Sequence, residues 1–298
     1  MNDKEKIFEE FYRLADFYYQ QNLIKDAQNY KKDFSAFLLY LHHIKTYELL
    51  APFCRDKTIL DIGCFLGYGE PYIAEEAKEV IAIDNNRGAI NFARNHYSLP
   101  NVDFRVVDAK QLPFEDESID IVLAVQLIEH IQPGEIEDFL KKIKKLLRKD
   151  GQLLLVTPNR EFRLLPFQKP FNPEHFQEFT KKTLHKSLEK IFDKIEIKGI
   201  YAAKWIEEIE RKRVRRSPLH FYINDPLIRL LRYIVQKTGI SQKNNAFFQR
   251  KQNDKETAYP CLEWDFDGLL EKLSDKDFFI KNEASKTALD LFSLCAKD

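Results

Sequence analysis

The chain has 298 residues, and 47 Lys and Arg balance 47 Asp and Glu, so its formal net charge is zero. Hydrophobic residues make up 44% and charged residues 32% of the chain, which is typical of a globular protein and excludes a wholly disordered one. The lack of a basic excess counts against a dedicated nucleic-acid-binding protein. The length predicts about two domains, or one domain with large additions.

Several negative features point to a cytoplasmic protein. No run of the sequence approaches the ~18 consecutive apolar residues that a membrane span requires. The opening residues mix acidic and basic side chains and lack the basic and apolar regions of a signal peptide. No Cys-x-x-Cys pair is present, so neither a zinc ribbon nor a disulfide framework is indicated. We expect reduced thiols at all four cysteines, Cys54, Cys64, Cys261 and Cys295.

Residues 1–55 predict a helical N-terminal cap. Apolar side chains recur there at three- and four-residue steps in two segments, which is the period of amphipathic helices. These side chains are Phe8, Phe11, Tyr12, Ala15, Tyr18 and Tyr19, then Phe34, Phe37, Leu38, Leu41 and Ile44. Simple packing of the two apolar stripes is favoured, and a cap over a bound cofactor is the functional alternative. The pair His42-His43 lies on the second helix, where we expect it to pack or face solvent.

Residues 56–201 alternate short apolar runs with amphipathic segments, a pattern typical of a doubly wound parallel α/β sheet. The runs are nearly continuous hydrophobics, as in parallel strands buried on both faces. Predicted strands span 58–62, 80–83, 104–107, 119–125, 153–156 and 194–201, with a seventh at 288–296. Helices are expected between them, for example over 87–95 and 135–148.

Residues 202–285 lack the alternating pattern of the preceding segment. We expect them to form a helical insertion before the last strand of the core, residues 286–298. The insertion contains the basic run Arg211–Arg216 and an amphipathic stretch, Pro226–Val235. A solvated helix face is the usual meaning of such a run, and a docking surface for phosphates is the alternative.

A glycine-containing turn follows the first predicted strand, in the order Asp61-Ile-Gly63-Cys-Phe-Leu-Gly67. A dinucleotide fingerprint would need glycine where Phe65 and Tyr68 stand, and no Walker A motif is present, so a pyrophosphate site is excluded. The two glycines permit a tight turn, and the Asp61 carboxylate suits a ligand that carries an amino group. The turn therefore predicts a cofactor site at the carboxyl edge of the sheet.

From Thr58 to Tyr201, and again in the final strand, the chain resembles the class I S-adenosylmethionine (SAM)-dependent methyltransferases. Asp84, after the second strand, stands where that family holds the ribose, and Asp108-Ala109 stands where it reads the adenine. The resemblance implies a Rossmann-like, seven-stranded, mostly parallel sheet with helices on both faces, and SAM as the methyl donor. It assigns cofactor binding to Asp61, Gly63, Cys64, Gly67, Asp84, Asn85, Asp108, Ala109 and Gln126. The family usually has glycine at Phe65, so this side chain must point away from the methionine moiety.

Candidate catalytic residues lie after the fourth and fifth strands: Glu129, His130 and His175. The segment 172–180 resembles bacterial methyltransferases associated with polysaccharide biosynthesis. More distantly, it resembles small-RNA 3′-end methyltransferases and ubiquinone-pathway O-methyltransferases. In those two groups the matching carboxylates and histidine hold a divalent metal. Gln126 replaces the first carboxylate here, which favours a metal-free site.

The sequence thus predicts a SAM-dependent methyltransferase that methylates an oxygen of a sugar or other small molecule. Two alternatives stay open. The basic run and the histidines support RNA methylation. Phe65 and Gln126 support a catalytically silent SAM-binding scaffold. The oligomeric state has no signal in the sequence.

Overall fold

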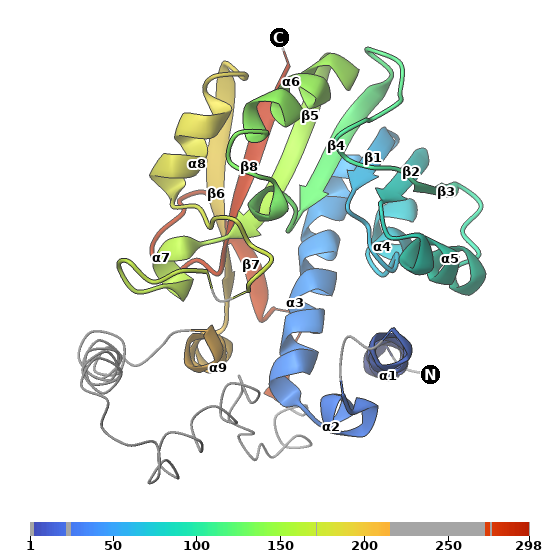
Figure 1. The fold of residues 1–298 in the computed structure, drawn as a ribbon, viewed down its shortest axis with the longest axis vertical. Helices are drawn as coiled ribbons and strands as arrows, with labels where there is room; N and C mark the ends of the chain where they lie inside the picture. Colours follow the sequence, from blue (N-terminus) through green and yellow to red (C-terminus); the bar gives the residue numbers. More distant parts are fainter. Residues whose placement is uncertain (1–2, 22–24, 171, 215–271, 275, 298) are drawn as a thin grey trace, which may run out of the picture.

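The computed structural model describes residues 3–21, 25–170, 172–214, 272–274 and 276–297, and within them one eight-stranded sheet forms the centre of the molecule (Figure 1). The strands are β1 Thr58–Ile62, β2 Glu79–Asp84, β3 Val102–Val106, β4 Ile119–Val125, β5 Leu147–Pro158, β6 Lys194–Ala202, β7 Phe278–Lys281 and β8 Asp290–Ala296. The α-helices are α1 Asp3–Gln20, α2 Ala27–Lys31, α3 Phe34–Leu50, α4 Glu70–Ala74, α5 Arg87–His96, α6 Ile136–Leu146, α7 Arg160–Arg163, α8 Lys181–Leu188 and α9 Lys204–Val214. Two short 3₁₀ helices, η1 Ala51–Cys54 and η2 Ile128–His130, complete the described elements.

The strand order is β3-β2-β1-β4-β5-β8-β6-β7. Strands β1 to β5 pair in parallel, and β8 is antiparallel to both of its neighbours, β5 and β6. The prediction of a mostly parallel Rossmann-like sheet is confirmed, but the predicted number of seven strands is wrong. The eighth strand, β7, pairs with β6 at the edge of the sheet and lies inside the range expected to be a helical insertion. Its four residues are too few to show a period in the sequence.

The boundary between the helix predicted over 135–148 and the strand predicted over 153–156 also shifts. Helix α6 ends at Leu146 rather than near residue 148, and β5 begins at once with Leu147, which pairs with Ile119. The ladder is irregular there, and Asp150 has a φ of 64°. β5 therefore begins six residues before the strand predicted over 153–156.

Helices cover both faces of the sheet, and each face has its own apolar core. On one face, Leu140 and Ile143 of α6 and Leu184 and Leu188 of α8 pack on the strands. On the other face, the packing comes from α3, α4 and α5, through side chains such as Leu50, Ile73 and Ile90. Burial on both faces explains why the strands read as continuous apolar runs.

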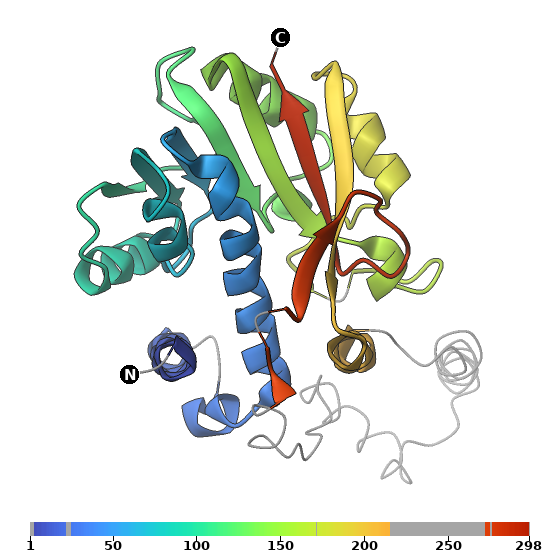
Figure 2. The ribbon, with the colours of Figure 1, turned by 180° about the vertical axis from the view of Figure 1, so that it is seen from behind.

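The N-terminal helices form a third apolar cluster, rich in aromatic side chains such as Phe11, Phe34 and Phe37. Figures 1 and 2 place α1, α2 and α9 at the end of the molecule toward which the arrowheads of β4 and β5 point. The helices predicted over residues 1–55 are therefore present: α1 and α2 lie at the carboxyl edge, and α3 runs from there onto one face of the sheet.

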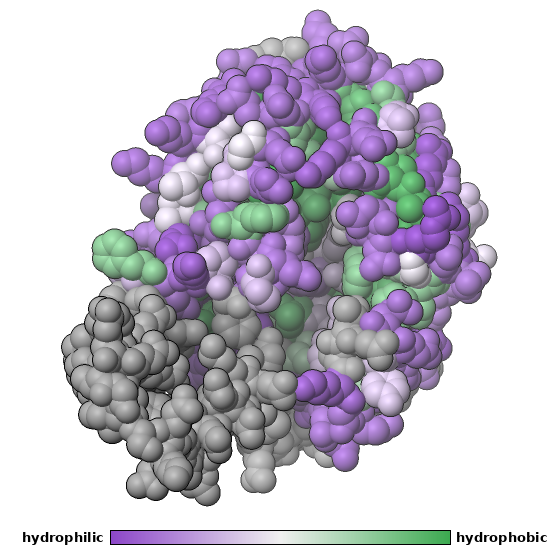
Figure 3. Space-filling view, viewed as in Figure 1, coloured by the Kyte–Doolittle hydropathy of each residue, from purple (hydrophilic) through white to green (hydrophobic). Residues whose placement is uncertain are grey.

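Three described cysteines, Cys54, Cys64 and Cys295, are buried free thiols, and Cys261 lies outside the described residues. The stretch Pro226–Val235 and the end of the basic run, Arg215 and Arg216, also lie outside them. In the part of the chain that the structure describes, no helix is both long enough and apolar enough to cross a membrane. The face drawn in Figure 3 is mostly hydrophilic, with apolar residues in small separate groups.

Candidate functional site

The loop after β1 is fixed by backbone hydrogen bonds to the neighbouring strand. The N–H groups of Gly63 and Cys64 both donate to the carbonyl of Ile83, at 2.8 and 3.1 Å. Gly63 and Gly67 have φ values of 87° and 75°, which favour glycine. A Cβ on Gly67 would also lie 2.7 Å from the Phe104 ring. Both glycines singled out in the sequence are therefore required by the shape of the turn.

Asp84, at the end of β2, holds the same loop from the other side. Its carboxylate accepts hydrogen bonds from the backbone N–H of Phe65 at 3.1 Å and of Asn86 at 2.7 Å. Burial raises the pKa of Asp84 even though these N–H groups favour the charged form. Asn85, assigned to the cofactor with it, is exposed to solvent.

Phe65 occupies the unusual position in this loop. Its φ of 49° is a left-handed conformation that costs a non-glycine residue about 1–2 kcal/mol. Its ring meets Phe17 at 6.2 Å and Tyr18 at 6.0 Å between centroids, both on α1. The side chain that replaces the usual glycine thus anchors the N-terminal helix to the predicted cofactor loop.

Two buried carboxyl groups, Asp61 on β1 and Glu70 at the start of α4, lie beneath the loop. Each is 1% exposed. Tyr47 donates its hydroxyl to Asp61 Oδ2 at 2.9 Å, whereas Asp61 Oδ1 and both Glu70 oxygens have no hydrogen-bond partner among the described residues. Burial raises the pKa of both groups. The Asp61 charge raises the pKa of Glu70 further, whereas a hydrogen bond from the Glu70 carboxyl lowers the pKa of Asp61. Orphaned acceptors of this kind fit an amino group, so the residues present suit SAM. Sequence reasoning missed Glu70, whose burial has no signal in the pattern.

The strand order brings the predicted cofactor residues into one row along the carboxyl edge. In space the row runs from Asp108, after β3, to Asp84, then the Gly63 loop, then Gln126, after β4. Asp108 is exposed, and its Oδ1 accepts from the backbone N–H of Lys110 at 2.8 Å, while the adjoining Ala109 is half-buried. The side chain of Leu127, next to Gln126, comes within 3.1 Å of where a Cβ of Gly63 would be.

Gln126 faces β8. Its backbone has a φ of 52°, its N–H donates to the carbonyl of Val156 at 2.8 Å, and its Nε2 donates to Asp290 Oδ2 at 3.0 Å. The side-chain amide is therefore committed to the last strand. It does not belong to the cluster of Glu129, His130 and His175.

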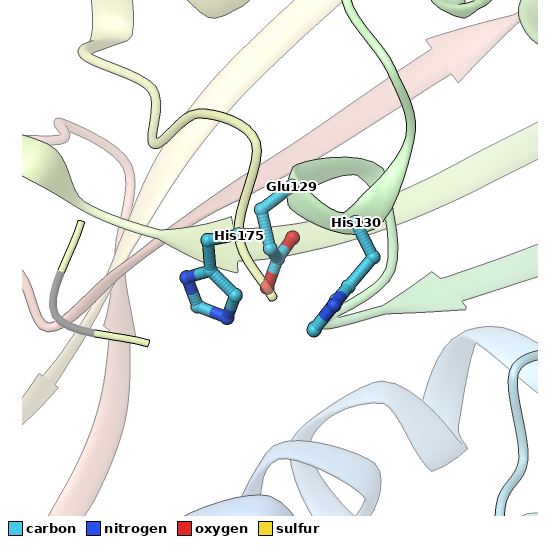
Figure 4. Close-up of side chains that lie close together, drawn as sticks. All are labelled: Glu129, His130 and His175. Atoms are coloured by element: carbon cyan, nitrogen blue, oxygen red, sulfur yellow. The ribbon is translucent and has the colours of Figure 1, made fainter. Parts of the chain in front are cut away.

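Glu129, His130 and His175 come together at the edge, as Figure 4 shows, although 45 positions separate the two histidines in the sequence. One ligand atom from each lies within 4.8 Å of the others, and the two imidazole rings meet edge to face at 4.6 Å. The loop that carries His175 is tied down by the Phe176 N–H, which donates to the carbonyl of Glu129 at 2.9 Å. His175 Nδ1 lies 3.1 Å from Glu178 Oε1.

The electrostatics of this cluster are set by burial. Glu129 is fully buried, and burial raises its pKa to about 8, although its Oε2 accepts a hydrogen bond from Thr157 Oγ1 at 2.8 Å. Its Oε1 has no hydrogen-bond partner in the part of the chain that the structure describes. Burial and the neighbouring His175 lower the pKa of His130. At neutral pH the Glu129 carboxyl thus favours its protonated form, and a divalent cation would have to displace that proton before binding.

A small polar pocket that the sequence did not indicate lies beside Gln126, with a cavity volume of about 10 Å³, room for about one water molecule. It is lined by Leu39, His42, His43, Gln126, Phe162, Arg163, Glu210, Arg213, Leu289 and Asp290. His42 and His43 pack within the protein, as expected: His42 stacks on the Phe278 ring, and His43 Nδ1 lies 2.8 Å from the Tyr68 hydroxyl. Both also line this pocket. The available signal was Asp290, an acidic residue within the apolar run 288–296.

Comparisons with known proteins point to the SAM-dependent methyltransferases. Residues 60–155 match the family model of a methyltransferase domain. A Mycobacterium tuberculosis protein named as a "probable S-adenosylmethionine-dependent methyltransferase" is 34% identical over 139 residues, which cover 47% of this chain and 49% of that protein. The ubiquinone biosynthesis O-methyltransferase of Rhizobium rhizogenes is 31% identical over 163 residues, 54% of this chain and 64% of that enzyme. The chain therefore spans about half the length of the first relative and under two thirds of the second.

The fold has counterparts among solved structures. A SAM-dependent methyltransferase from Thermotoga maritima superposes with a TM-score of 0.52 over 91% of this chain and 97% of that one, at 14% sequence identity. Identity at this level shows a shared fold and nothing about the acceptor.

Proposed function

We propose that this chain, whose residues 60–155 form a methyltransferase domain of the SAM-dependent class, transfers a methyl group from SAM to a hydroxyl oxygen of a sugar or another small molecule. The observation that carries the proposal is the loop after β1, which Gly63, Gly67 and the Asp84 carboxylate hold at the carboxyl edge of the sheet. Ligands bind at this edge in doubly wound folds.

The cofactor is assigned to residues along the row at this edge. Asp84 would accept hydrogen bonds from the ribose hydroxyls, because a carboxylate offers two acceptor oxygens to a vicinal diol. Asp108 and Ala109 would flank the adenine. Asp61 would accept a hydrogen bond from the amino group, since its buried Oδ1 has no partner in the described structure. When bound, SAM supplies a methyl group on a positively charged sulfur, so the donor needs no further activation.

The acceptor is assigned to the cluster of Glu129, His130 and His175 at the same edge of the sheet. We assign Glu129, His130 and His175 to contact with the acceptor after the cofactor is bound, and we favour a metal-free role because Gln126 is committed to Asp290.

RNA methylation is less well supported. In the described part of the basic run, Arg213 is buried against Glu210, with its Nη2 2.7 Å from a carboxylate oxygen. Arg211 lies over the Phe162 ring at 4.7 Å. Both guanidinium groups make contacts within the protein, so they do not form a free surface for phosphates.

Two measurements test the proposal. Isothermal titration with SAM and S-adenosylhomocysteine should give saturable binding of both. Tritiated SAM should then label one fraction of a cell extract separated into glycan, lipid, small-molecule and RNA pools. Label in the glycan or small-molecule pool supports the proposal, and label confined to RNA refutes the acceptor class. Cofactor binding without any labelled pool would instead favour a silent scaffold.

A further inference from the structure

The proposed cofactor loop has a buried carboxyl group at each end. Asp61 lies on β1 just before the turn, and Glu70 is the first residue of α4, so the turn with Gly63 and Gly67 lies between them. Each of the two side chains is 1% exposed. Glu70 has no part in the function proposed above, although a carboxyl group buried at this depth costs stability unless it has a partner.

The two carboxyl groups lie within hydrogen-bonding reach of each other. Carboxylates only accept hydrogen bonds, so with both groups ionised Asp61 Oδ1 and both Glu70 oxygens have no donor among the described residues. One proton on Glu70 removes this defect, because the carboxylic acid donates to the Asp61 carboxylate. The geometry therefore favours a pair that holds one proton.

Tyr47 of α3 holds this pair together at the base of the loop. Helix α3 packs against α4 (Figure 1), and the Tyr47 side chain is buried there. Its hydroxyl donates to Asp61 Oδ2 at 2.9 Å, and its ring closes on the far end of the loop, where a Cβ on Gly69 would lie 2.6 Å from ring carbons. Tyr47 thus contacts both Asp61 and the residue before Glu70, which limits how far the two carboxyl groups can separate.

The environment of the pair decides which carboxyl group keeps the proton. Burial raises the pKa of Glu70 well above its usual value, and the Asp61 charge raises it further, with only backbone N–H groups acting in the opposite direction. Burial raises the pKa of Asp61 to about 6, with Asp84 of β2 adding to the rise and the hydrogen bonds from Tyr47 and Glu70 opposing it. At neutral pH Glu70 therefore holds the proton and Asp61 is ionised.

The other titratable groups that face the pair come from η1, from the loop itself and from the end of α5. They are Cys54, Cys64, Tyr68 and Tyr97. Burial raises the pKa of each of them, so all four are uncharged at neutral pH. In the described part of the chain no cationic side chain shifts the pKa of either carboxyl group, so a proton is what keeps the pair from carrying two negative charges.

We propose that Glu70 is a positioning residue of the cofactor loop: its protonated carboxyl group donates to the Asp61 carboxylate and closes the loop at its base. The inference rests on the proposed function, because it takes this loop to be the one that holds SAM. Asp61 keeps acceptor sites for the amino group of SAM, since a carboxylate offers about four lone-pair sites and Tyr47 and Glu70 take one each. The pair presents one negative charge, which matches the single positive charge of an ammonium group.

The first test measures the Kd of S-adenosylhomocysteine at pH 7 by isothermal titration of the full chain. The wild type, Glu70→Gln and Glu70→Ala have the same charge at the pair at this pH, so differences among them report the hydrogen bond. Glutamine can donate its amide N–H to Asp61, so Glu70→Gln should keep the wild-type Kd. Alanine cannot, and Kd should rise by about 10-fold or more, the usual effect of losing a hydrogen bond to a charged group.

The second test follows amide hydrogen exchange of residues 63–69 in the ligand-free chain. At pH 7 the wild type and Glu70→Gln should protect the loop equally. A group whose pKa is raised in the folded state loses its contribution as pH rises through that pKa. At pH 10 the wild-type loop should therefore exchange about 10-fold faster than the loop of Glu70→Gln, because ionised Glu70 no longer donates and repels Asp61, whereas glutamine does not ionise.

A matched control and a spectroscopic readout accompany these tests. Glu75, at the other end of α4, is exposed, so Glu75→Gln should behave as the wild type in both assays. Infrared spectra at pH 7 should show a protonated-carboxyl band that Glu70→Gln removes, while the band of Glu129 remains and disappears only in Glu129→Gln.

The failures of the two proposals can be told apart. A wild-type chain that does not bind S-adenosylhomocysteine refutes the proposed function, and the ligand-free exchange and the infrared band then decide on the carboxyl pair alone. A wild type that binds, together with a Glu70→Ala variant of equal Kd, refutes only the role of Glu70. Loop exchange that rises with pH equally in the wild type and in Glu70→Gln overturns the shared proton, and this comparison decides even if Glu70→Ala does not fold.

Discussion

Replacing Asp84 by alanine tests the link between the cofactor and the structure of its loop. The carboxylate has two tasks: it accepts from the Phe65 and Asn86 N–H groups at 3.1 and 2.7 Å, and it is proposed to accept from the ribose diol. Hydrogen bonds to a charged group contribute about 1.5–3 kcal/mol each, and a lost pair that water can replace contributes less. We expect the cofactor to lose about 1–3 kcal/mol of binding free energy, which raises Kd by roughly 5- to 150-fold.

The same substitution should also destabilise the fold, because the two loop N–H groups lose their acceptor. At about 1 kcal/mol per net hydrogen bond, the free energy of unfolding should fall by about 1–2 kcal/mol. Isothermal titration with S-adenosylhomocysteine measures the affinity, and thermal unfolding measures the stability. The matched control is Asp103→Ala on β3, whose side chain is half exposed and pairs with Arg105 on the surface. That pair contributes about 0–1 kcal/mol, so the control should change little.

The reasoning would be refuted by an Asp84→Ala variant that binds S-adenosylhomocysteine as tightly as the wild type. A loss of stability without a loss of affinity would reduce Asp84 to a residue that shapes the loop. A loss of affinity in Asp103→Ala of similar size would show that the assay reports general damage.

Three further outcomes are expected. Burial raises the pKa of Glu129 to about 8, so the folded state keeps a proton that the unfolded state loses above pH ~4.5. The free energy of unfolding should therefore fall as pH rises from 5 to 8. Chemical denaturation measures this fall, which should be weaker in Glu129→Gln. His130→Ala should leave the Kd of S-adenosylhomocysteine unchanged and lower kcat without moving the pH profile of kcat. If the acid limb of that profile shifts, His130 acts as the general base. Wild-type turnover should survive exhaustive chelation; activity that vanishes and returns with Mg²⁺ or Mn²⁺ would assign a metal to Glu129, His130 and His175.

The sequence by itself determined the class of the sheet and the position of the glycine turn after β1, which is the proposed cofactor loop. Both depend on local properties: continuous apolar runs indicate strands buried on both faces, and glycines at 63 and 67 indicate a turn with positive φ, which the structure has. Asp84 could be placed at a strand end for the same reason. The boundaries of the N-terminal cap, core and insertion stay predictions.

The tertiary structure alone decided which residues meet. The order β3-β2-β1-β4 is not the order of the chain, so the row from Asp108 to Gln126 cannot be derived from spacing. His42 and Asp290 are 248 positions apart, and their contact exists because β8 inserts between β5 and β6 while α3 crosses that edge. The burial that raises the pKa of Glu129 likewise comes from packing of distant segments. Local sequence carries propensity, whereas contact, burial and the protonation that follows from them are properties of the folded chain.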